Sequence, residues 1–162
     1  MPFTPFHFGP GAALAAVAPR HVSFVAFCAV NVLIDVETLL NIVYGREPLH
    51  AFFHTPFGAT LAAAATVPMV LLVRAIVRRW RRLDFFALAG LTLRQIVLGA
   101  LAGAWSHVVL DGIMHADASP LAPFVAGNAL HGLVDVRMLH AACTLAGVAG
   151  LAVWLWRDAR RE

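Results

Sequence analysis

Charged residues are scarce in this chain, and lysine is missing altogether. Asp, Glu, Lys and Arg make up 13% of the 162 residues, whereas 60% are hydrophobic and the mean hydropathy is +0.78. An ordinary soluble domain has about 25% charged residues. The shortage of charge therefore excludes an ordinary soluble domain and predicts a polytopic protein whose main partner is the lipid bilayer.

Cysteine is also rare, with Cys28 and Cys143 as the only two. Both lie within apolar runs, so we expect packed thiols, and the chain has no disulfide framework, redox motif or thiolate metal site. The sequence shows no internal repeat, no phosphate-binding glycine loop and no Ser-His-Asp pattern. The N-terminus lacks a basic region and a cleavage site, so we expect no cleaved signal peptide.

Four apolar stretches are long enough, or nearly so, to cross a hydrocarbon core, which takes about 20 helical residues. We place them at residues 22–43, 57–77, 93–115 and 138–156. A fifth stretch, from Pro10 to Ala18, is too short to cross and is stopped by Pro19, so we expect a half-length or re-entrant helix. The predicted fold is all-α, a single membrane-embedded domain over residues 1–162 with four long helices and one short N-terminal helix.

The arginines predict the orientation of these helices. One cluster consists of Arg74, Arg78, Arg79, Arg81 and Arg82, and a second consists of Arg157, Arg160 and Arg161. The positive-inside rule places both clusters in the cytoplasm. The net charge of +3 is therefore a matter of topology, and we expect no nucleic-acid partner.

Histidines and carboxylates lie toward the outer ends of these spans. They are His7, Asp35, Glu37, His50, His54, His107, Asp111 and His115. A charged group at the centre of a bilayer costs about 2.5–3.5 kcal/mol on insertion scales, so such residues indicate a metal or proton site. From the helix rise, His107 lies roughly 16 Å and Asp111 roughly 22 Å from the inner boundary. We therefore predict a recess that opens outward, below the membrane surface.

The segment WSHVVLDGIMHAD contains the strongest candidates. His107 and Asp111 present an imidazole nitrogen and a carboxylate oxygen one helical turn apart, and both are good ligands for zinc and related divalent ions. His115 follows after one further turn and faces the same side, as a third ligand or, together with Asp117, as a cap at the helix exit. A hydrogen-bonded pair that holds two helices together is the structural alternative for His107 and Asp111.

The remaining ligands must come from other helices. Asp35 and Glu37 point about 200° apart on a continuous helix. We take Asp35 as the ligand and Glu37 as its supporting partner or as a general base. His50 and His54 share an i, i+4 spacing, and we expect one of them to be a plain interfacial histidine, with His54 the preferred ligand. His7 is either a ligand or an interfacial anchor.

One asparagine and one pair of glycines within the predicted spans are suited to helix packing. Asn31 lies one turn before Asp35 and is expected to bond a neighbouring helix or to support the site. Gly99 and Gly103 form a GxxxG motif, which permits close helix approach inside the monomer or in a homodimer.

Taken in order, four segments carry a resemblance to a known family. They are TPFHFGPGAAL, LIDVETL, HAFFHT and SHVVLDGIMHADASPLAPF, within roughly residues 1–125. This order resembles that of the membrane-bound metal-dependent hydrolases of bacteria, also described as LexA-binding, inner-membrane-associated hydrolases. The chain departs from the family in Ile34, where proline is usual, in Glu37, where a second aspartate is frequent, and in HTP in place of THS.

The resemblance implies a multi-pass protein of the bacterial inner membrane that hydrolyses its substrate with a divalent metal, zinc on base rates. The ligand order is also similar to that of zinc-dependent phospholipase C and of zinc nucleases that cut single strands. By that analogy the substrate is a phosphoester or a lipid head group, and Asp35 or Glu37 orients or deprotonates the attacking water. The alternative is a non-enzymatic membrane protein, either a metal or proton conductor or a stress-linked scaffold.

Overall fold

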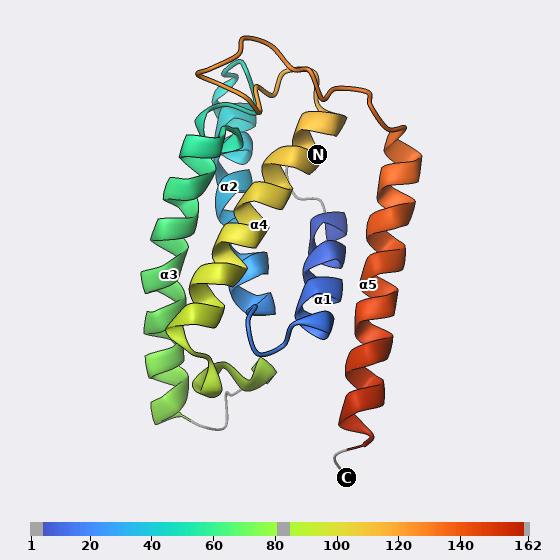
Figure 1. The fold of residues 1–162 in the computed structure, drawn as a ribbon. Coiled ribbons are helices and arrows are strands. Elements are labelled where there is room, and N and C mark those ends of the chain that lie inside the picture. Colours follow the sequence, from blue (N-terminus) through green and yellow to red (C-terminus); the bar gives the residue numbers. More distant parts are fainter. Residues whose placement is uncertain (1–4, 81–84, 161–162) are drawn as a thin grey trace.

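The computed structural model describes residues 5–80 and 85–160, and every regular element in these ranges is a helix (Figure 1). Four helices are long and apolar enough to cross a membrane: α2 (Phe24–Tyr44), α3 (Pro56–Arg79), α4 (Leu93–Met114) and α5 (Val136–Asp158). The shorter elements are η1 (Pro5–His7), α1 (Phe8–Val17), η2 (Phe52–His54) and η4 (Phe85–Gly90). The predicted all-α fold, with four long helices and a short N-terminal one, is confirmed.

The observed helix ends differ from the predicted ones by at most two residues, and polar caps decide where the long helices begin. These caps are Ser23, Thr55, Thr92 and Asp135. Each side-chain oxygen accepts hydrogen bonds from backbone N–H groups of the first turn, which have no partner within the helix. Thr92 forms a full capping box with Gln95, so Gln95 is a capping residue.

Helices α2, α3 and α4 pack around one apolar core, and α1 joins α5 to them (Figure 1). In the most apolar stretch of α4, 50% of the residues are buried inside the protein, against 11% for α5. Helix α5 is therefore a peripheral helix, and most of its apolar surface is left for lipid.

Helices α2 and α4 approach each other closely at the GxxxG motif. A Cβ atom on Gly99 would lie 2.4 Å from the carbonyl oxygen of Ser23, and one on Gly103 would lie 2.6 Å from that of Phe27. Only glycine allows this contact, which brings the first half of α4 against the start of α2. The motif thus serves packing inside the monomer. A homodimer through the same two glycines stays a prediction, and it would need α2 to leave this face.

The arginine-bearing ends of α3 and α5 lie at one end of the bundle, and the histidine-bearing elements meet toward the other (Figure 1). Arg81, Arg82 and Arg161 are outside the described residues. Helix α1 has 10 residues, about 15 Å of rise, and descends to the arginine end, where a short turn leads into α2. It is a short helix of half a span, as predicted, and whether it is re-entrant stays a prediction.

Candidate metal centre

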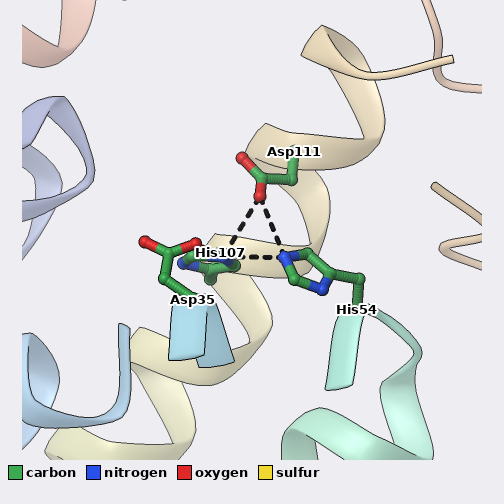
Figure 2. A group of neighbouring side chains, drawn as sticks. All are labelled: Asp35, His54, His107 and Asp111. Atoms are coloured by element: carbon green, nitrogen blue, oxygen red, sulfur yellow. Dashed lines mark hydrogen bonds and ion pairs between the residues drawn. The ribbon is translucent and has the colours of Figure 1, made fainter. Parts of the chain in front are cut away.

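Four buried side chains converge where α2, η2 and α4 meet (Figure 2). Helix α2 contributes Asp35, η2 contributes His54, and α4 contributes His107 and Asp111. One ligand atom from each lies within 4.8 Å of the others. We call these four residues the inner group, and both of its histidines have no exposed surface.

The distances within the inner group fit a single tetrahedral ion. The Nε2 atom of His107 lies 3.1 Å from Asp111 Oδ2, 3.3 Å from Asp35 Oδ1 and 3.3 Å from the Nε2 atom of His54. His54 Nε2 lies 3.2 Å from the same Asp111 oxygen. With metal bonds of about 2.0–2.1 Å, the ligand atoms of a tetrahedral site are about 3.3–3.4 Å apart. These four separations match a tetrahedral site to within a few tenths of an ångström, and the two that join Asp35 to His54 and to Asp111 are at most 4.8 Å.

Asn31 fixes which nitrogen of His107 faces the centre. Its amide nitrogen donates a hydrogen bond of 2.7 Å to the carbonyl of Phe27, so its oxygen, 2.9 Å from His107 Nδ1, must accept. Nδ1 consequently carries the hydrogen, and Nε2 of a neutral ring presents its lone pair to Asp35 and Asp111. A lone pair facing two carboxylates is repulsive unless a metal cation lies between them or a proton is bound to Nε2.

Glu37 fixes the backbone next to His54. Its two oxygens accept hydrogen bonds from the backbone N–H groups of Phe52, at 3.1 Å, and Phe53, at 2.7 Å. The second oxygen lies 3.6 Å from His54 Nδ1. Burial alone would lower the pKa of His54, but the carboxylates of Asp111 and Glu37 outweigh it and raise that pKa. Both oxygens of Glu37 are engaged by backbone N–H groups, and its role as supporting partner or general base stays a prediction.

Three further histidines surround the other oxygen of Asp111. His7 Nε2 lies 3.2 Å from Oδ1 and His115 Nε2 lies 3.9 Å from it. His50 stacks on His115 with ring centroids 3.9 Å apart. We call His7, His50 and His115 the outer group. All seven side chains predicted as metal ligands thus lie in one cluster, and their role as ligands stays a prediction.

Two sequence-based alternatives for these histidines are wrong. His50 and His54 are both buried, so neither is a plain interfacial histidine. They are buried because the loop before α3 folds inward, where the Asn41 amide donates to the carbonyl of Leu49 at 3.0 Å. His7 is 2% exposed and touches Asp111, so it does not anchor the chain at the interface.

Asp117 was not expected to support the site. Its carboxylate lies 2.9 and 3.0 Å from His50 Nδ1, and one oxygen also accepts the backbone N–H groups of Leu49 and His50. Partial burial alone would raise the pKa of Asp117, but these hydrogen bonds outweigh it and lower that pKa. Asp117 therefore orients His50 instead of capping the exit of α4.

Burial and the neighbouring His50 both lower the pKa of His115.

Several buried polar atoms of the cluster have no hydrogen-bond partner among the described residues. They are both ring nitrogens of His7, Nδ1 of His54 and Oδ1 of Asp111. Leaving such a group unpaired costs about 1–3 kcal/mol. The two buried carboxylates of the inner group also carry a charge of about −2, which one divalent cation would neutralise. Both observations fit the cluster to a metal ion.

The chain matches no protein-family model, no curated protein and no solved structure. Fold and site together define a multi-pass membrane protein with a buried His/Asp group that could hold a metal ion. The family resemblance stays a prediction that rests on the order of the motifs.

Proposed function

We propose that this protein is a metal-dependent hydrolase that acts on a phosphoester or a lipid head group at the outer face of the bacterial inner membrane. One observation carries the proposal: four buried side chains each place one ligand atom within 4.8 Å of the others, with four of these separations at 3.1–3.3 Å. Two imidazoles and two carboxylates suit zinc, although manganese and iron accept the same ligands.

A divalent ion held by the inner group would supply a Lewis acid that lowers the pKa of water and polarises the scissile bond. Because the four inner-group residues would fill a tetrahedral ion, that water would enter as a fifth ligand. Asn31 keeps the His107 imidazole oriented toward that ion, and Glu37 fixes the backbone of η2, which carries His54. One oxygen of Asp35 faces His107, while Figure 2 shows the other pointing away from it. We assign to this second oxygen the task of accepting a proton from the attacking water.

The surroundings of the site favour a substrate that lies at the membrane interface. The loop that follows α4 carries exposed apolar side chains, among them Phe124, which is 89% exposed, and Leu133, which is 67% exposed. Apolar side chains at the rim of a membrane protein insert at the boundary between head groups and acyl chains. The positions of the described arginines at the opposite end support an outward-facing site.

A conductor is the weaker alternative because polar groups do not continue through the bundle. Among the described residues, the buried polar side chains outside the histidine end are Ser23 and Thr66. The Ser23 hydroxyl accepts from the N–H of Ala26, and the Thr66 hydroxyl donates to the carbonyl of Ala62. Both hydroxyls are thus engaged by their own helix and offer no path for an ion.

The proposal is tested with the purified full chain in detergent or nanodiscs. Metal content and hydrolysis of bis(p-nitrophenyl) phosphate and of phospholipid vesicles are measured for the wild type and for Asp111→Asn. We expect bound metal and turnover in the wild type and the loss of both in the variant, because an amide oxygen is a much poorer ligand than a carboxylate. Asp158→Asn, an exposed change at the arginine end, is the matched control and should keep both.

Equal, stoichiometric metal in the wild type and in Asp111→Asn would contradict the assignment of Asp111 as a ligand. Bound metal without turnover on any phosphoester or lipid would overturn the hydrolase in favour of a non-enzymatic scaffold.

A further inference from the structure

The two oxygens of Asp111 face different sets of histidines. Oδ2 faces His54 and His107 of the inner group, at 3.2 and 3.1 Å. Oδ1 faces His7 at 3.2 Å and His115 at 3.9 Å. The carboxylate of Asp111 therefore separates two sets of imidazole nitrogens. An ion held by the inner group uses only one of the two Asp111 oxygens.

The outer group contains a second set of possible ligand atoms. One atom each from His50, Asp111 and His115 lies within 4.8 Å of the others. None of the three outer histidines belongs to the inner group, so an ion held by the inner group leaves their nitrogens unused.

His50 makes the hydrogen bond to a carboxylate that metal-binding histidines usually make. The carboxylate of Asp117 occupies its Nδ1 and is itself fixed by the backbone N–H groups of Leu49 and His50. A carboxylate on one ring nitrogen fixes the tautomer and leaves the other nitrogen as a basic ligand. The Nε2 atom of His50 is thereby the free one.

His7 and Oδ1 of Asp111 provide the second, independent observation. His7 and Asp111 are both 2% exposed, and the two atoms that lie 3.2 Å apart make no hydrogen bond. Buried polar atoms nearly always have a partner, so this unsatisfied pair marks a position that another group fills.

We infer that Asp111 bridges two divalent ions, the inner one on Oδ2 and a second one on Oδ1 with ligands from His7, His50 and His115. This inference deepens the proposed function and rests on it. The spacings of 3.2 and 3.9 Å from Oδ1 are below about 4.2 Å, twice a typical bond length and so the widest separation of two ligands on one ion. Hydrolytic two-metal sites hold their ions about 3.5–4 Å apart, which a bridging carboxylate permits.

The charges of the cluster agree with two ions. Its carboxylates are Asp35, Glu37, Asp111 and Asp117, with a combined charge of about −4. Two divalent cations balance this charge in full, whereas one balances half of it and leaves Glu37 and Asp117 to their backbone N–H partners.

The second ion is the weaker one. Its ligand atoms are more widely spaced than those of the inner group, the side chain of His115 is 26% exposed, and the stacked rings of His50 and His115 must turn to converge. An exchangeable ion at the open side of the site is placed to receive a phosphate oxygen of the substrate, while the inner ion stays fixed.

The test is the metal content of the purified full chain after loading with Zn²⁺ alone and removal of the excess. We expect two ions per wild-type chain and one in His115→Ala. His131→Ala, which removes an exposed loop histidine, is the control and should keep two. One ion in the wild type, with hydrolysis intact, would overturn the second site and leave the proposed function standing. Two ions in the wild type without any hydrolysis would support the second site and overturn the proposed function.

Loading the wild type with Mn²⁺ tests the same inference without a variant. Two ions bridged by one carboxylate give an exchange-coupled electron paramagnetic resonance spectrum, and partial treatment with a chelator should convert it to that of a single isolated ion. A spectrum of isolated Mn²⁺ at full loading would contradict the bridge.

Discussion

Replacing Asn31 by leucine tests whether the histidine tautomers are set for metal binding. Asn31 is 1% exposed, and its side chain links α2 to His107 through the bond of 2.9 Å to Nδ1. Leucine keeps the bulk of the side chain and removes the acceptor. The His107 ring then loses the group that directs its Nε2 atom toward Asp35 and Asp111.

The expected loss falls mainly on metal affinity. Removing such a partner of a ligating histidine lowers metal affinity about 10–100-fold. This corresponds to about 1.4–2.7 kcal/mol. A hydrogen bond between membrane helices contributes only about 0.6 kcal/mol on average to stability. The change in Zn²⁺ affinity should therefore exceed the change in unfolding free energy of the metal-free protein.

The assay is a Zn²⁺ titration in competition with a chromophoric chelator, beside an unfolding measurement on the metal-free protein. Asn31→Asp keeps an acceptor for Nδ1 and should stay closer to the wild type than Asn31→Leu. Thr66→Val, which removes a buried hydroxyl engaged by its own helix, is the control and should bind Zn²⁺ normally. A folded Asn31→Leu protein with wild-type affinity would refute the reasoning.

Three other predictions follow from the same structure. Glu37→Gln should weaken metal binding, because Glu37 holds the backbone of Phe52 and Phe53, yet leave kcat nearly unchanged at saturating metal. General acid–base catalysis contributes at least about 100-fold, so a larger loss of kcat would instead make Glu37 the general base. Gly103→Ala should destabilise the protein by about 1–3 kcal/mol in an unfolding assay, since its Cβ would meet the Phe27 carbonyl, whereas Gly90→Ala meets nothing within 4 Å and should be neutral. Topology reporters at Arg82 and at the C-terminus should read cytoplasm and one at Gly127 should read outside, and an external Arg82 reporter would reverse the facing of the site.

The long helices were predictable because a membrane span is a local property of the chain. About 20 consecutive apolar residues suffice to identify one, and helices α2 to α5 each satisfy that condition. The i, i+4 spacing of His107 and Asp111 likewise placed two ligand candidates on one face of α4 without knowledge of the other helices. The polar positions Asn31, Asp35 and Thr38 repeat at i, i+4 and i+7, so the buried polar stripe of α2 was also present as a pattern.

The contacts made by loops were not predictable in this way. Asp117 reaches His50 across 67 positions of the sequence, through two segments without helical periodicity. The burial of both His50 and His54 depends on the inward fold of the loop before α3, which Glu37 and Asn41 hold by hydrogen bonds to its backbone. Such contacts arise from tertiary packing, so the sequence alone left His50, His54 and Glu37 with two alternatives each.

X-ray absorption at the zinc edge of the purified, Zn²⁺-loaded protein tests the metal centre most directly. The structure predicts nitrogen and oxygen ligands at about 2.0–2.1 Å with the outer-shell scattering of imidazole rings, and no sulfur. The imidazole signal should fall in a His54→Ala variant and persist in His131→Ala. A protein that retains no zinc, or a spectrum with sulfur at about 2.3 Å, would contradict the centre built from Asp35, His54, His107 and Asp111.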